Sequence, residues 1–232
     1  MNQPMAKTIL DQTIGQVFGY QNPLSLDQAM QKFAFDVRLP QQVYDATTGQ
    51  QTWAASIGDT QYLTLANAVE RSKNGDNLRD YQKMTSVEDV MNAWASVNYA
   101  MTERQIASTN VAESDGVYHS ENIYRSLDIR KSKNILFSDG VDECDHIVAG
   151  QTSKKLQYCV RVEDSKNIVE SFNVIWSNKI TRSLFIRDCY DLVDCMFCTH
   201  LAGKKFCIAN IQLEEAEYKA LRDKIVRWIL QG

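Results

Sequence analysis

The sequence predicts an α+β protein built around a β-solenoid of the hexapeptide type. Apart from residues 151–153, residues 109–195 divide into fourteen hexads whose third residue is Val, Ile or Leu and whose sixth is Ser, Cys or Gly. Such a short fixed period is typical of a coil whose turns stack on one another. A period of six also fits extended strands, because on a helix with 3.6 residues per turn the aliphatic side chains would wander around the surface.

The composition favours a folded protein with a real core and excludes several functional classes. The chain has 232 residues, of which 44% are hydrophobic and 23% are charged. A net charge of −4 argues against a dedicated nucleic-acid binder, which needs a concentrated basic surface. We find no apolar stretch of about 20 residues for a membrane span, and no secretory signal at the start. We therefore expect a protein that is cytoplasmic on synthesis.

Residues 1–108 form a helical and irregular N-terminal segment without a repeat. Ser25 and Gln28 make a capping box, which predicts a helix from there to Ala34. Residues 43–53 place a glycine between aromatic and β-branched residues, which indicates a hairpin or an ordered loop. Helices are predicted over residues 60–72 and 86–106. The second has an apolar face that we expect to pack in the core, consisting of Val90, Met91, Trp94, Val97 and Met101.

Each hexad predicts where the coil bends. Its third and sixth residues are an odd number of positions apart, so both can face inward only if a corner separates them. We place the small residue at this corner, where a hydroxyl can bond to local backbone, and the frequent Asn, Asp or Gly on its other side.

The number of sides of the coil follows from the number of hexads in a turn. Three hexads give a three-sided coil with an offset of about 18 residues between stacked positions, as in hexapeptide β-helices, and two give an offset of about 12. The three-sided coil is our prediction. Residues 151–153 interrupt the hexads, and we expect them to form a bulge or small loop at a corner.

After Cys195 the pattern decays, and residues 196–232 are predicted to form a cap with a C-terminal helix. A solenoid exposes strand edges and core at its ends, so we expect caps there. This helix and the N-terminal helical segment are the candidates for covering the two ends.

All six cysteines lie between Cys144 and Cys207. Most occupy the small-residue position of the hexads, so we interpret them as buried core residues and assign no metal site or cofactor. The alternative is a zinc site, because Cys-x-x-Cys with a further Cys and a nearby His supplies the ligands of a tetrahedral centre. Its ligands would be Cys195, Cys198, His200 and Cys207.

Two histidines bear on catalysis. His119 and His146 are expected to face solvent near corners, without the partners of a catalytic triad. Hexapeptide-repeat acyltransferases use a histidine, so an enzyme of that type is the runner-up. In those enzymes the aliphatic and small residues are four apart, whereas here they are three apart. We assign no catalytic or cofactor-binding residues.

The C-terminal part resembles a known family. Cys195–Cys198, the stretch from Gly203 to Gln212 and the sequence from Glu215 to Tyr218 are similar to the ending of an uncharacterised family from metagenomic bacteria and tailed phages. Its members carry repeats rich in Asn, Ser and Cys before a "kkYCI-N-Q…EEY"-like ending. Some relatives have an N-terminal cysteine-rich zinc module, but this chain has no cysteine before Cys144. Residues 43–53 resemble the phage members.

Together these observations favour a non-enzymatic structural or protein-interaction protein. The resemblance implies that it is phage-encoded and associated with the virion, with the solenoid as a rigid scaffold for protein partners or self-assembly. The alternatives are the acyltransferase and a phage-encoded inhibitor that binds a host factor. We infer no membrane, nucleic-acid or small-molecule partner.

Overall fold

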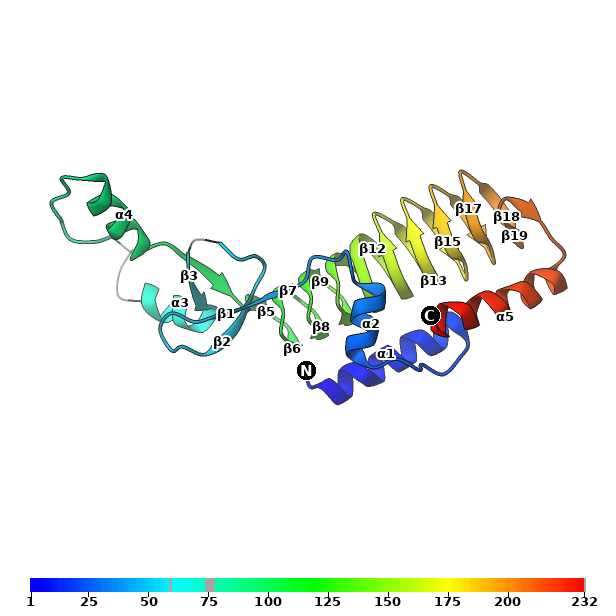
Figure 1. Ribbon diagram of the computed structural model, residues 1–232, viewed down its shortest axis with the longest axis horizontal. Helices are drawn as coiled ribbons and strands as arrows, with labels where there is room; N and C mark the ends of the chain where they lie inside the picture. Colours follow the sequence, from blue (N-terminus) through cyan, green and yellow to red (C-terminus); the bar gives the residue numbers. More distant parts are fainter. Residues whose placement is uncertain (59, 74–77, 232) are drawn as a thin grey trace.

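The computed structural model of the protein describes residues 1–58, 60–73 and 78–231 and shows a long β-solenoid flanked by helices (Figure 1). Helices α1 (Gln3–Phe18), α2 (Leu26–Phe33) and α5 (Glu215–Gln231) lie along one side of the coil. A small lobe formed by residues 41–102 lies beyond its first turn, and we call it the N-terminal lobe. The predicted solenoid and its two flanking helical segments are therefore confirmed.

The solenoid contains short parallel strands joined by tight bends. Only the last pair, between β19 and β20, is antiparallel. The strands are β5 (Gln105–Ile106), β6 (Thr109–Ala112), β7 (Asp115–Tyr118), β8 (Glu121–Tyr124), β9 (Leu127–Arg130), β10 (Lys133–Leu136), β11 (Asp139–Asp142), β12 (Asp145–Glu163), β13 (Lys166–Ile175), β14 (Asn178–Thr181), β15 (Leu184–Arg187), β16 (Tyr190–Val193), β17 (Met196–Thr199), β18 (Ala202–Lys205), β19 (Cys207–Ile208) and β20 (Ile211–Gln212). The coil thus continues past Cys195, where the predicted cap was to begin.

One turn of the coil contains twelve residues. Ile123 pairs with Ile135, and Ile135 pairs with Ile147 in the next turn, and the same offset runs through the whole ladder. The prediction of a three-sided coil was therefore wrong, because two hexads and not three complete a turn.

The backbone bends at a regular three-residue interval. Every third residue from Asn110 to Ala209 has a φ angle between 43° and 73°, in the left-handed region. The residue after each of these points inward, and every third residue from Ser114 to Cys198 is buried. The left-handed residues explain how the third and sixth residues of a hexad can both face inward, as predicted. They also explain the frequent Asn, Asp and Gly, which tolerate this conformation best.

The small inward residues hold successive turns together. The Ser126 hydroxyl donates to the Tyr124 carbonyl at 2.9 Å and accepts a hydrogen bond from the Ser138 amide of the next turn at 3.1 Å. The same pair of bonds recurs at the other serines with an offset of twelve residues. The predicted bond between the corner hydroxyl and the local backbone is confirmed, and a bond between turns accompanies it.

Residues 151–153 form neither the predicted bulge nor a loop. Gln151 pairs with Asp139 and Ser153 pairs with Val141, so the twelve-residue register continues through them. Because every third residue points inward, three extra residues preserve this spacing. They advance the chain by a quarter of a twelve-residue turn. The insertion therefore exchanges the small and the aliphatic residues at the inner positions of the coil. Ser153 stacks on Val141 of the preceding turn, and Leu156 stacks on Cys144.

A row of apolar side chains on the outside of the coil binds the three flanking helices. We call it the outer apolar row. The Phe172 ring of this row makes edge-to-face contacts with Phe18 of α1 at 5.3 Å and with Phe33 of α2 at 5.7 Å between centroids. The row recurs every twelve residues and consists of Ala112, Tyr124, Leu136, Val148, Val160, Phe172, Leu184, Met196 and Ile208. The three helices cover this row along the side of the coil and not its ends, whereas the N-terminal lobe, which belongs to the predicted N-terminal segment, lies beyond the first turn (Figure 1).

The described part of the N-terminal lobe combines two small sheets and two helices. The predicted hairpin is present as antiparallel β1 (Gln41–Tyr44) and β2 (Gln51–Ala54). The lobe also contains β3 (Gln61–Thr64), α3 (Leu65–Ser72), α4 (Val87–Ala95) and β4 (Tyr99–Thr102), with β3 parallel to β4. The helices predicted over 60–72 and 86–106 are therefore too long, because parts of both segments form these paired strands instead.

The exposed edge strand in the last turn of the coil carries charged residues. Lys204 pairs with Leu192 and takes the place of an inward aliphatic residue, but it is exposed, as is all of β18. Charged residues on an edge strand discourage pairing with other chains. Strand β20 folds back onto β19 and covers the neighbouring edge.

Candidate functional site

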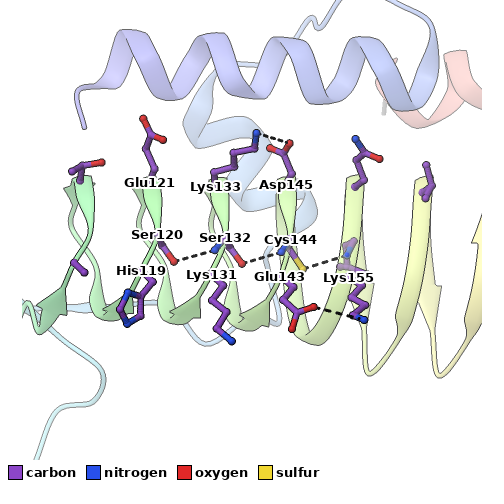
Figure 2. Close-up of a pocket in the computed structure, with 15 residues that line it drawn as sticks. His119, Ser120, Glu121, Lys131, Ser132, Lys133, Glu143, Cys144, Asp145 and Lys155 are labelled. Atoms are coloured by element: carbon purple, nitrogen blue, oxygen red, sulfur yellow. Dashed lines mark hydrogen bonds and ion pairs between the residues drawn. The ribbon is translucent and has the colours of Figure 1, made fainter.

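A shallow groove runs along one corner of the first turns, where the inward residues are small. Ser120, Ser132 and Cys144 form its floor, and the groove has a volume of about 760 Å³ (Figure 2). The groove forms here because a serine or cysteine fills less space than the aliphatic residues at the neighbouring inner positions. It ends near Leu156, the first aliphatic residue that occupies this corner after the insertion.

The walls of the groove carry charges of both signs. One wall has His119, Lys131, Glu143 and Lys155 in successive turns, and Glu121, Lys133 and Asp145 line the other (Figure 2). Lys133 Nζ lies 3.4 Å from Asp145 Oδ2, and Lys155 Nζ lies 3.8 Å from Glu143 Oε2. Because stacked strands are about 4.8 Å apart, side chains of opposite charge meet in adjacent turns and largely neutralise one another.

The hydroxyl and thiol groups on the floor already have structural partners. The Ser120 hydroxyl donates to the Tyr118 carbonyl at 2.8 Å and accepts from the Ser132 amide at 3.1 Å. Burial raises the pKa of the Cys144 thiol to about 11, so the nucleophilic thiolate is scarce at neutral pH. The floor therefore supports the coil and does not resemble an activated nucleophile.

The two histidines considered for catalysis lie in different surroundings. His119 lines the groove, as Figure 2 shows. His146 was expected to face solvent, but its side chain is only 12% exposed because it lies beneath α1. Its Nδ1 lies 2.7 Å from Asp145 Oδ1, and its Nε2 lies 3.2 Å from Gln12 Oε1 on α1. Both ring nitrogens of His146 thus have partners, and Nε2 links the coil to α1.

Beneath α1, asparagine side chains form a ladder that ends at Asp145. Asn110 donates to Asn122 at 3.0 Å, and Asn122 donates to Asn134 at 2.9 Å. Asn134 then donates to the Asp145 carboxylate at 3.0 Å. Because these asparagines also take the left-handed backbone conformation, one residue type serves both the bend and the ladder.

The four proposed zinc ligands do not converge. Cys195, Cys198 and Cys207 are buried inside the coil, whereas the His200 side chain is 74% exposed and lies 3.1 Å from Asp188. A hydrogen bond to Cys198 and burial both raise the pKa of the Cys195 thiol. Within the described ranges, no group of three His, Cys, Asp or Glu residues is arranged to hold a metal ion. All six cysteines are buried, and the core interpretation had predicted this for most of them.

Helix α4 has the exposed apolar face that the sequence was expected to bury. It begins where the helix was predicted to begin, with a capping box between Ser86 and Asp89, but none of its residues is buried. Trp94 is 47% exposed, and Val90 and Met91 are exposed to a similar degree. The prediction of core packing was wrong, because this face of α4 is exposed.

No protein-family model matches the chain, and neither does the sequence of any curated protein. The resemblance to the metagenomic and phage family therefore stays a prediction. None of the helices in the described part of the chain is long and apolar enough to cross a membrane.

Proposed function

We propose that this protein is a non-enzymatic structural protein, in which the solenoid is a stiff rod and the N-terminal lobe attaches it to a second copy of the chain. The observation that carries the proposal is the uncovered apolar face of α4. Helices as short as α4 are only marginally stable unless an apolar face packs against something. Contiguous exposed apolar surface of this kind is typical of interaction sites.

The surroundings of α4 favour a second copy as the occupant. The acidic residues Glu88 and Asp89 begin the helix, and the basic residue Lys83 precedes it. In a symmetric dimer the same patch meets itself, so a patch that carries both charges beside an apolar centre is complementary to its own copy. Trp94 in the centre is of the residue type that most often dominates such interfaces.

The coil suits the role of a rigid spacer. Inward serines bond each turn to the next, and the outer apolar row holds three helices along its length. A pre-organised ladder loses little conformational entropy when it binds a partner. The resemblance of the C-terminal part is our reason for placing the protein in a phage particle.

An acyltransferase is the second candidate, and we rank it lower. The hexapeptide enzymes have three-sided coils, which need about 18 residues in a turn, whereas this coil has twelve. A phage-encoded inhibitor would also use a protein surface, but it would act without particle association.

Mass photometry and sedimentation of the full chain test the proposal, together with electron microscopy of the native particle. We expect a concentration-dependent oligomer that Trp94→Glu weakens by tenfold or more, because a charge would enter the apolar centre. Tyr44→Ala is the matched control, since Tyr44 is an exposed aromatic residue on the hairpin of the same lobe. A monodisperse monomer without particle association would refute the structural role.

A further inference from the structure

A second groove begins at Thr152 and runs along the following turns of the coil, and it differs from the first in chemistry. Because the insertion exchanges the inner positions, the small residues now occupy the neighbouring corner, with Ser165, Ser177 and Cys189. The groove above them has a volume of about 600 Å³. Two aromatic side chains stand in it, and both are about half exposed, Trp176 at 54% and Tyr190 at 47%.

Trp176 occupies a backbone position that suits a different residue. Its φ angle is 50°, in the left-handed region that Asn, Asp and Gly tolerate and that is costly for a bulky residue. The residues one turn before and one turn after, Asp164 and Asp188, are of the tolerant type. Phe137 has the same conformation but is completely buried, so packing offsets the cost there. Trp176 is about half exposed, so burial offsets less of the cost there than at Phe137.

Neighbouring charges hold both aromatic rings in place. The Arg187 guanidinium lies 4.9 Å from the centre of the Trp176 ring, and Lys179 Nζ lies 5.1 Å from the centre of the Tyr190 ring. The Trp176 indole also donates to Asp164 Oδ2 at 3.2 Å. The rings therefore have little freedom to lose when a ligand stacks on them.

Polar groups with spare hydrogen-bonding capacity line the same groove as the rings. Asn178 uses its carbonyl oxygen to accept from Asn167 at 2.8 Å, which leaves its amide hydrogens available. Thr152 and Lys166 also line the groove. A sugar ring has a face of C–H groups that stacks on aromatic rings and a rim of hydroxyls that both donate and accept hydrogen bonds. Rings flanked by amide, hydroxyl and ammonium groups match this combination.

We propose that this groove binds a neutral oligosaccharide, with Trp176 and Tyr190 as stacking platforms and Asn178, Thr152 and Lys166 as hydrogen-bonding groups. Two other ligand classes fit less well. An extended peptide adds to a sheet at a free edge, but β14 and β16 are each paired on both sides. A nucleic acid needs a concentrated positive surface, whereas the two lysines of this groove are Lys154, which is already paired with Asp142 and Glu143, and Lys166, and Asp164 lies beside them.

Calorimetric titration of the full chain with hexasaccharides of glucose, mannose, galactose and N-acetylglucosamine tests the inference. We expect at least one of them to bind, and Trp176→Asn to weaken its binding at least tenfold. Asn tolerates the left-handed backbone, so this variant should keep the melting temperature of the parent chain or raise it. Tyr44→Ala, which removes an exposed aromatic residue in the N-terminal lobe, should bind as the parent does.

Two outcomes would overturn the inference. One is the absence of binding to all four hexasaccharides at millimolar concentration, and the other is binding that Trp176→Asn leaves unchanged. Retention of a protein partner that depends on Trp176, without saccharide binding, would likewise assign the groove to protein recognition instead. The result is independent of the proposed self-association, because Trp94→Glu alters the N-terminal lobe and leaves this groove intact.

Discussion

Replacing Ser126 by alanine tests whether the inward hydroxyls hold the coil together. Ser126 is completely buried, and its hydroxyl is the partner of the Ser138 amide in the next turn. Alanine has nearly the same size but removes the acceptor, which leaves the Ser138 N–H buried without a partner. Leaving a buried donor unsatisfied costs about 1–3 kcal/mol. The Tyr124 carbonyl keeps its bond from the Phe137 amide, so only one group loses its partner.

The chain itself offers a matched replacement. At Cys144, a sulfur in the corresponding position accepts a hydrogen bond from the Leu156 amide at 3.4 Å. Ser126→Cys should therefore lose less free energy of unfolding than Ser126→Ala, because a weaker bond is kept. Ser72→Ala, at an exposed serine on α3, should change the free energy of unfolding by no more than about 0.5 kcal/mol.

Urea unfolding followed by circular dichroism measures these free energies, and thermal unfolding provides a second measurement. A loss of 1 kcal/mol lowers the melting temperature by about 2–4 °C in a protein of this size. If Ser126→Ala is as stable as the parent chain, or if cysteine costs more than alanine, the hydroxyl bonds between turns do not stabilise the coil as inferred.

Three further predictions concern the core, the lobe and the thiols. Ile180 is completely buried between aliphatic residues of the turns above and below. Ile180→Ala should therefore lower the free energy of unfolding, measured in urea, by about 2–5 kcal/mol. A loss below about 1 kcal/mol would contradict this packing. Burial acts to raise the pKa of Asp45, but hydrogen bonds from groups such as the Thr64 amide outweigh it and hold the pKa well below its usual range. This stabilisation is complete above the unfolded pKa of about 3.9 and is lost as the pH falls through the folded pKa, so Asp45→Asn should destabilise the N-terminal lobe at neutral pH and flatten its acid melting profile. Burial raises the pKa of Cys144 to about 11 and that of Cys159 to about 12, so iodoacetamide at pH 8 should label them only in urea, and rapid labelling of the folded chain would argue against their burial.

The sequence predicted the coil because its inner positions repeat at short range. Aliphatic residues fill the interior of the coil, and small residues allow the chain to bend. Each hexad contains both kinds of residue. The number of sides of the coil depends on which residues stack in successive turns, and the pattern within a single hexad does not contain this information. It could have been found from the outer apolar row, because apolar residues recur every twelve positions from Ala112 to Ile208. That row also marks the side that the helices cover.

The N-terminal lobe was predicted less well for a different reason. The capping boxes at Ser25 and Ser86 are local hydrogen-bond patterns, and both start helices as predicted. The ends of those helices depend on tertiary pairing, such as that of β3 with β4. Whether the apolar face of α4 is buried depends on what packs against it. The same amphipathic pattern occurs in helices that pack in a core and in helices that form an interface. The first groove was missed because it results from the stacking of small residues in successive turns.

The insertion at residues 151–153 connects the inside and the outside of the coil. Before it, the outer apolar row uses the fourth residue of alternate hexads, as at Val148, and after it the row uses the first residue, as at Val160. Without the three extra residues the row would step sideways by a quarter of a turn, and it would no longer be continuous beneath the helices. The inner positions exchange as a result, and Gly150 makes the exchange possible. A side chain there would meet Ile147 at 2.8 Å and Val141 at 2.9 Å. The small and aliphatic residues thus exchange inner positions, while the outer apolar row beneath the helices stays continuous. The same exchange moves the small-residue corner to the side of the coil where Trp176 lies.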